Sequence, residues 1–110
     1  MTLRRLLFQI VWACLAQCGA PAGAATIEVT VADLVFSPAE ASAAVGDTIR
    51  FVNRDFVDHT ATAVNGGFDL DLPAGGDAST IVGNAGTFDY FCRFHPDMTG
   101  RIIVSAGNGR

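Results

Sequence analysis

Three residues with metal-binding side chains lie within seven positions of one another near the end of the chain: Cys92, His95 and Met98. The other histidine of the sequence is His59. Together these four residues offer a thiolate, two imidazoles and a thioether. A trigonal copper site with a weak axial sulfur ligand requires this donor set. The sequence therefore predicts that the four residues bind one copper ion.

The mixture of donors favours copper over zinc. A soft thiolate suits Cu(I), imidazole suits both oxidation states, and a distant thioether keeps the site between the geometries that each state prefers. Structural zinc sites use four strong ligands, and methionine is unusual among them. Taken singly, Cys92, Met98 and His59 fit a buried apolar residue, a core gap-filler and a loop residue. Their clustering is what indicates a shared ion.

The first 24 residues have the pattern of a secretory signal peptide. Residues 1–5 form a short positive segment, residues 6–18 are mostly apolar, and residues 22–24 are the small residues of a cleavage site. The apolar run is shorter than the roughly 20 residues that a spanning helix needs. We therefore expect export, with no membrane insertion of the mature domain.

Two details of export are not decided by the sequence. Arg4 and Arg5 match the twin-arginine signal poorly, so the Sec and Tat routes both stay open. Lipidation at Cys18 is a minor alternative, because Gln17 stands where a small residue is preferred. Cleavage after residue 24 would give a single mature domain, residues 25–110.

The mature domain is strongly acidic and has one cysteine. It contains five arginines, eleven acids and no lysine, a formal net charge of minus six. This balance argues against nucleic acid or an anionic membrane surface as a partner, and it favours either a basic protein partner or solubility alone. Cys92 cannot form an internal disulfide, so the thiol is either buried and inert or used in chemistry.

Alternation of apolar and polar residues with a period of two recurs through the mature chain, as in Ile27, Val29 and Val31. Turn signals rich in Gly, Pro and Asn separate these runs at the spacing of short antiparallel strands. The predicted strands span residues 26–32, 40–44, 48–54, 59–64, 78–82, 87–92 and 100–104. Because no convincing amphipathic helix appears, we predict an all-β sandwich. A core this small gains from a bound metal.

The predicted strands place the donors at one end of the sandwich. Alternation in residues 87–92 turns Phe88, Tyr90 and Cys92 inward. Pro96 stiffens the loop that follows, and Gly100 lets the chain turn into the last strand. His59 stands at the mouth of an earlier strand, so the fourth donor has to come from a separate loop.

Other candidate features carry less chemistry. Two pairs of acids supply too few oxygen ligands for calcium, and we expect them to be solvated; they are Asp55 with Asp58, and Asp69 with Asp71. Several phenylalanines fall on apolar strand faces and are expected in the core; they are Phe36, Phe51, Phe68 and Phe88.

A longer motif carries a family resemblance. It reads Tyr90-Phe91-Cys92-x-x-His95-Pro96-x-Met98-x-Gly100, with Asn53 upstream of His59. In this motif and in the short ligand loop, the mature domain resembles the cupredoxins. The resemblance implies a Greek-key β-sandwich and a type 1 copper site with His59, Cys92 and His95 equatorial and Met98 axial. It also implies one-electron transfer in the periplasm, and a role for Asn53 in tying the two ligand-bearing loops together.

Three departures from the pattern of short-loop cupredoxins affect the site. Phe94 replaces a proline and supplies a backbone N–H, which we expect to donate to the Cys92 thiolate and raise the reduction potential. Arg93 replaces a small residue and brings a cation. Asp58 and Thr60 flank His59 in place of proline and asparagine. We therefore do not transfer to this chain the hydrogen bonds that the family's first histidine ligand makes, nor the redox partner known for the family.

Two functions of different classes follow. The first is a monomeric electron carrier that meets redox proteins through an apolar patch around His95, formed by Phe94, Pro96 and Met98; the alternative for this patch is closure of the sandwich end. The second is copper storage, delivery or resistance without a dedicated redox partner. An enzyme is disfavoured, because a second copper centre needs further histidines and a dinuclear site needs a second cysteine.

Overall fold

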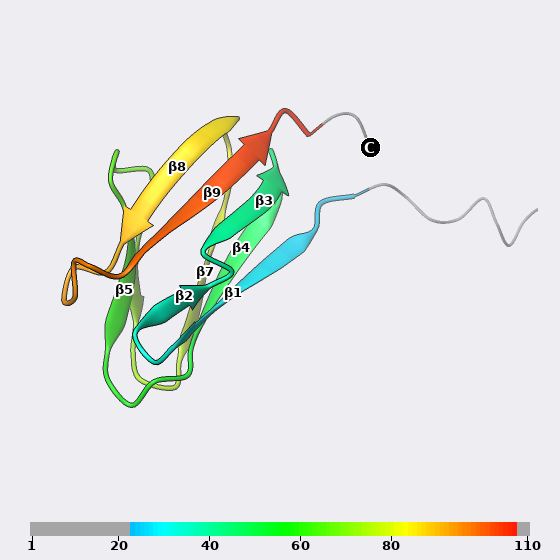
Figure 1. Cartoon of the computed structure of the whole chain (residues 1–110). Coiled ribbons are helices and arrows are strands. Elements are labelled where there is room, and N and C mark those ends of the chain that lie inside the picture. The colour runs from blue at the N-terminus through cyan, green and yellow to red at the C-terminus, as the bar shows by residue number, and fades with distance from the viewer. Residues whose placement is uncertain (1–22, 108–110) are drawn as a thin grey trace, which may run out of the picture.

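The computed structural model describes residues 23–107, and within that range the chain forms nine strands and no helix (Figure 1). The strands are β1 (Thr26–Ala32), β2 (Val35–Ser37), β3 (Glu40–Ala44), β4 (Thr48–Asn53), β5 (His59–Ala63), β6 (Asp69–Leu72), β7 (Asp77–Ile81), β8 (Gly86–Phe91) and β9 (Thr99–Ser105). The described part of the chain accordingly holds no helix that is long and apolar enough to cross a membrane. Nearly all of the predicted signal peptide lies outside the described residues.

The strands form two sheets that pack into a sandwich. The first sheet has the order β2-β1-β4-β7, and the second has the order β3-β9-β8-β5-β6. Two pairings are parallel, β1 with β4 and β3 with β9, and the other pairings are antiparallel. The predicted all-β sandwich is confirmed, whereas the Greek-key connectivity stays a prediction.

The core lies between the inner faces of the two sheets. Alternation in β1 and β4 buries Val29, Val31, Ile49 and Phe51, as their period-two patterns require. Tyr90 of the second sheet stands at the centre of an aromatic cluster; its ring centroid lies 4.8 Å from that of Phe36, 5.3 Å from that of Phe51 and 6.0 Å from that of Phe68. The predicted phenylalanine core is present, with Phe68 and Phe88 only partly buried.

All seven predicted strands are present, and none of their ends is displaced by more than one residue. The structure adds β2 and β6. In β6, Asp69 and Asp71 alternate with Leu70 and Leu72, and Leu72 is fully buried. Asp69 and Asp71 are exposed on the outer face of this strand, so the prediction that they are solvated is confirmed, whereas the strand itself was not predicted.

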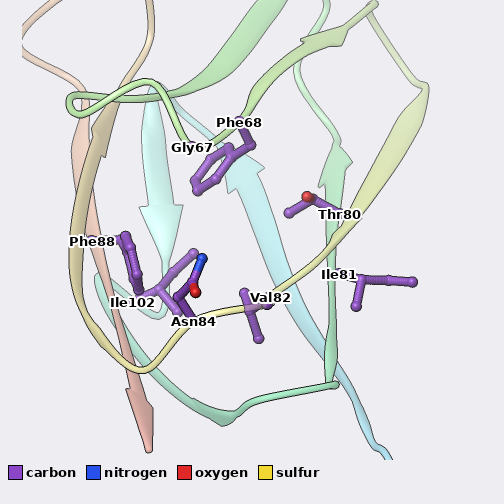
Figure 2. Close-up of a pocket in the computed structure, with 9 residues that line it drawn as sticks. Gly67, Phe68, Thr80, Ile81, Val82, Asn84, Phe88 and Ile102 are labelled. Atoms are coloured by element: carbon purple, nitrogen blue, oxygen red, sulfur yellow. The ribbon is translucent and has the colours of Figure 1, made fainter.

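A small cavity lies between the sheets, away from the predicted donors. Its volume is about 70 Å³, and Figure 2 shows Phe68, Val82, Phe88 and Ile102 around the same space, with Ile81 pointing away from it. The loop before β8 borders this cavity, whereas Cys92 follows the other end of β8. The cavity is therefore a packing feature at the opposite end of β8 from the donor residues.

Candidate metal centre

The structure brings three of the four predicted donors together. The ligand atoms that His59, Cys92 and His95 can offer all lie within 4.8 Å of one another. Cys92 Sγ lies 3.7 Å from His59 Nδ1 and 3.9 Å from His95 Nδ1. The two imidazole rings stand 5.2 Å apart between centroids, at 63°. His59 and Cys92 are buried, and His95 is partly exposed.

Strand register explains why His59 and Cys92 meet. β5 pairs antiparallel with β8, with Thr62 opposite Phe91. Continuing this register beyond the end of β8 places Thr60 opposite Arg93, and His59 one step further along. His59 is the first residue of β5, and Cys92 directly follows β8. The inner faces of two neighbouring strands therefore deliver both side chains to one end of the sandwich.

Two backbone hydrogen bonds close the loop that carries the other donors. The Cys92 N–H donates to the Met98 carbonyl at 3.1 Å, and the Met98 N–H donates to the His95 carbonyl at 2.8 Å. Met98 is 5% exposed. The sequence placed Met98 in an exposed patch, and this was wrong because the loop turns its side chain into the core cluster. The exposed apolar residues beside His95 are Phe94 and Pro96.

Thr60 links the strand of His59 to the loop of Cys92. Its N–H donates to Cys92 Sγ at 3.4 Å, and its hydroxyl accepts from the Arg93 N–H at 2.8 Å. The hydroxyls of Thr60 and Thr62 lie 3.0 Å apart, and the Thr62 hydroxyl donates to Asp69 at 2.7 Å. Since the Thr62 proton is used on Asp69, the Thr60 hydroxyl donates to Thr62.

Arg93 completes this chain of hydrogen bonds into a ring. Its guanidinium Nε donates to Asp69 at 3.1 Å, and its Nη2 donates to Asp71 at 3.0 Å. The guanidinium carbon also lies 5.7 Å from the centroid of the Phe94 ring. The cation expected near the site is therefore paired with two carboxylates of β6 instead of acting on the donors as a lone charge.

Asn53 has a different role from the one that the family resemblance implies. Its Nδ2 donates to the carbonyls of Val57 and Leu72, both at 2.9 Å, and its Oδ1 accepts from the Asp55 N–H at 2.9 Å. These bonds shape the loop that precedes His59 and hold it against the end of β6. The link to the Cys92 loop is made by Thr60 instead, which sequence reasoning did not assign.

Asp55 is held in place rather than solvated, contrary to the sequence prediction. Its Oδ2 lies 2.8 Å from His59 Nε2, and the side chain is 14% exposed. The same carboxylate accepts the N–H groups of Asp33, at 2.6 Å, and Leu34, at 3.0 Å. The Leu34 N–H is the largest cause of the lowered pKa of Asp55; burial opposes it, and the bonds to His59 and Asp33 add to it. Asp55 and His59 are four residues apart, but this spacing predicts a contact only on a helix, so the sequence offered no signal for this one.

The surroundings of Cys92 favour its thiolate. Burial raises the pKa of the thiol, but hydrogen-bond donors around the sulfur, the Thr60 N–H first among them and then His95 and the Phe94 N–H, lower it to about 6. The Phe94 contribution is the weakest, and it has the sign expected from the sequence. A thiolate is the form that binds metal.

The donor set fits one copper ion on its chemistry. A buried thiolate and two imidazoles converge, which suits a soft cation that also accepts nitrogen ligands. The same loop carries the buried Met98, and the backbone of Met98 is hydrogen-bonded to the backbone of both Cys92 and His95.

Comparison with known proteins agrees with this chemistry. The family described as "Cupredoxin-like domain" matches residues 5–104. The chain belongs to the cupredoxin-like family. It is also 31% identical over 84 residues to amicyanin from Paracoccus denitrificans, a match that covers 71% of this chain and 64% of the relative. The chain thus spans just under two thirds of that protein's length.

Solved cupredoxin structures have the same fold. An oxidised amicyanin variant superposes with a TM-score of 0.66 at 29% identity, covering 72% of this chain and 81% of the other. A reduced amicyanin variant gives 0.64 at 31% identity, covering 80% and 88%. A purple cupredoxin from Nitrosopumilus maritimus gives 0.63 at 28% identity, covering 74% and 99%. As a cupredoxin, the chain has its candidate donors positioned for one copper ion.

Proposed function

We propose that this cupredoxin is a periplasmic one-electron carrier with a mononuclear type 1 copper site, and not an enzyme. His59, Cys92 and His95 are the equatorial ligands in this proposal, and Met98 is the axial ligand. Copper, when bound, supplies a one-electron change between Cu(II) and Cu(I). The observation that carries the proposal is the convergence of one buried thiol and two imidazoles within 4.8 Å.

The chain's own residues hold the donors still. Cys92 accepts a hydrogen bond from Thr60, His59 is bonded to Asp55, and the loop from Cys92 to Met98 is closed by its own backbone. A rigid, buried set of donors changes little in geometry when an electron arrives, which supports rapid electron exchange.

The proposed mature domain is residues 25–110, after removal of a signal peptide. Ala25 supports this boundary, because its N–H donates to the buried Asp47 carboxylate at 2.8 Å and its carbonyl accepts from the Thr48 N–H at 2.9 Å. Gly23 and Ala24 are exposed. N-terminal sequencing of the exported protein tests the boundary, and a start well inside β1 would contradict it.

Copper uptake is tested by visible spectroscopy of the purified domain. Addition of Cu(II) is expected to give an intense thiolate-to-copper charge-transfer band and a reversible Cu(II)/Cu(I) couple. Cys92→Ser is expected to abolish the band, while Ser105→Ala, an exposed change in β9, leaves it intact. A weakly coloured domain that passes Cu(I) readily to apo-acceptors would instead favour copper storage or delivery.

Electron exchange is proposed to take place at His95. Its edge is partly exposed beside Phe94, which is 54% exposed, and Pro96. Phe94→Glu is expected to slow electron exchange with redox proteins without loss of copper, because a charge would enter an apolar contact. Ile81→Glu is the matched control, since Ile81 is 70% exposed on β7 in the other sheet. Unchanged rates in Phe94→Glu with every partner tested would refute this surface.

A further inference from the structure

We infer that Asp55 is a positioning residue that prepares His59 for copper before the metal arrives, by joining the imidazole to the β1–β2 turn. This inference rests on the proposed function, because it takes His59 as a copper ligand. It concerns the copper-free protein, in which Asp55 fixes both the protonated ring nitrogen and the orientation of the ring.

The carboxylate determines which nitrogen of His59 is available. Asp55 Oδ2 lies 2.8 Å from His59 Nε2, and an ionised carboxylate can only accept a hydrogen bond. Nε2 of the neutral imidazole must therefore carry the proton. Nδ1 keeps its lone pair, and it is the nitrogen that lies 3.7 Å from Cys92 Sγ. The metal-facing nitrogen is thus left free to bind.

The same carboxylate holds a strained turn of the other sheet. Asp33 and Leu34 join β1 to β2 with φ angles of 51° and 62°, in the left-handed region that residues other than glycine rarely adopt. Their successive N–H groups point at one acceptor, as in an anion-binding backbone nest. Asp55 occupies that position with bonds of 2.6 Å and 3.0 Å.

Asp55 itself is fixed from behind. Its N–H donates to Asn53 Oδ1, and Asn53 is buried at the end of β4. A continuous set of hydrogen bonds therefore runs from Asn53 through Asp55 to His59, with a branch to the β1–β2 turn. The turn also places Leu34 beside the ligand loop, where it borders the same surface hollow as His95 and Met98.

Asparagine cannot replace this carboxylate, because its amide has one acceptor oxygen and one donor nitrogen. In one orientation the amide oxygen accepts from the Leu34 N–H and from His59, and the NH2 group then faces the Asp33 N–H, which is also a donor. In the other orientation the NH2 group faces His59 Nε2 and requires that nitrogen to accept a hydrogen bond. Asp55→Asn therefore either frees the Asp33 amide or moves the His59 proton to Nδ1.

The test uses the copper-free domain and then copper binding. In wild type at pH 8, long-range ¹H–¹⁵N correlation is expected to show His59 protonated on Nε2, and the Asp33 and Leu34 amides are expected to exchange slowly with solvent. Asp55→Ala is expected to lose the single tautomer, expose both amides to exchange, and lower Cu(I) affinity about 10- to 100-fold. Asp58→Asn is the control; the Asp58 carboxylate accepts the Ala74 N–H and lies in the same loop.

Each outcome decides the inference. Wild-type His59 protonated on Nδ1 would overturn it, and so would an Asp55→Ala variant that keeps the ring-nitrogen shifts and the copper affinity. If Asp55→Ala does not fold, the wild-type tautomer and amide exchange decide the question alone. A wild-type domain with the Nε2 tautomer but no copper uptake would support the role of Asp55 and contradict the proposed function.

Discussion

The ring of Tyr90 in β8 lies across the backbone of Gly100 in the neighbouring strand β9, where the two residues are directly paired. A Cβ atom at position 100 would come within 2.7 Å of Tyr90 Cε1 and would also collide with Cζ and Oη. The sequence predicted Gly100 as the start of the last strand, where glycine would let the chain turn in, but β9 already begins at Thr99. Glycine is required here because it has no side chain under the Tyr90 ring.

Gly100→Ala is expected to lower the free energy of unfolding of the copper-free domain by about 1–3 kcal/mol, the usual cost of overpacking a core. Urea denaturation measures it. Gly83→Ala is the control, because Gly83 has open space where a Cβ would be placed. Equal stability of the two variants would show that Tyr90 moves aside without cost.

Tyr90→Phe is expected to leave stability unchanged or raise it by about 1 kcal/mol, despite the loss of a hydroxyl from the core. Among the described residues, the Tyr90 hydroxyl is a buried group with no hydrogen-bond partner, so it loses its hydration on folding without replacement. Thermal and urea unfolding of both proteins at pH 7 give the comparison. A loss of more than 1 kcal/mol would indicate a partner such as a bound water.

Alkaline pH is expected to unfold wild type more readily than Tyr90→Phe. Burial raises the pKa of Tyr90 above its ordinary 10.0. A raised pKa means that the neutral group contributes full stability below pH 10, and that this stability is lost as the pH rises from there toward the folded-state pKa. Tyr90 is the single tyrosine of the chain, so phenolate absorbance reports it alone. Phenolate that forms near pH 10 without unfolding would contradict the prediction.

The strands that sequence reasoning found and missed differ in a simple way. β1, β4 and β8 have apolar residues alternating with polar ones over six or seven residues, and such a run is readable from the sequence alone. β2 has three residues and gives too short a pattern. β6 does alternate, as Asp-Leu-Asp-Leu, but over only four residues. The alternation of its acidic and apolar residues, and not the strand propensity of those residues, could have identified β6.

The donors of the candidate site could be predicted because their types and spacing are local, with the exception of His59. Their supports could not, because each depends on a pairing between distant segments. Thr60 meets Cys92 and Arg93 through the β5–β8 register, and Asp55 meets Asp33 through contact between a loop and the turn of another sheet. Sequence spacing alone contains no information about either register.

Thr60→Val is expected to destabilise the copper-free domain by about 1–3 kcal/mol, because it leaves the partly buried Arg93 N–H without an acceptor while keeping the side-chain volume. Thr60→Ser keeps the hydroxyl and is expected to retain the ring of hydrogen bonds. Urea unfolding and exchange of the Arg93 amide are measured together. Slow exchange of that amide in Thr60→Val would contradict the assigned bond.

Acid is expected to break the same ring at Asp69. The hydrogen bond from Thr62 is the largest cause that lowers the pKa of Asp69 below 3.8. The partial loss of hydration opposes this shift, and Arg93 adds to it. A lowered pKa means that the stabilising contribution is present above pH 3.8 and is lost as the pH falls through the folded-state value. Between pH 5 and pH 2, wild type should therefore lose more stability than Asp69→Asn, measured by urea unfolding at each pH. If the stability of both proteins fell in parallel with pH, Asp69 would be excluded as a source of the acid-dependent loss of stability.

Phe94→Pro is expected to lower the reduction potential of the copper-loaded domain. The Phe94 N–H favours the Cys92 thiolate and withdraws electron density from sulfur, which favours Cu(I), and proline has no N–H to donate. A weak hydrogen bond of about 0.5–1.5 kcal/mol corresponds to a fall of about 20–60 mV for one electron. Phe94→Ala distinguishes the effect of the N–H from the effect of the aromatic ring, because it keeps the N–H and removes the ring. Voltammetry that gave Phe94→Pro a potential equal to or above that of Phe94→Ala would contradict the role of this N–H.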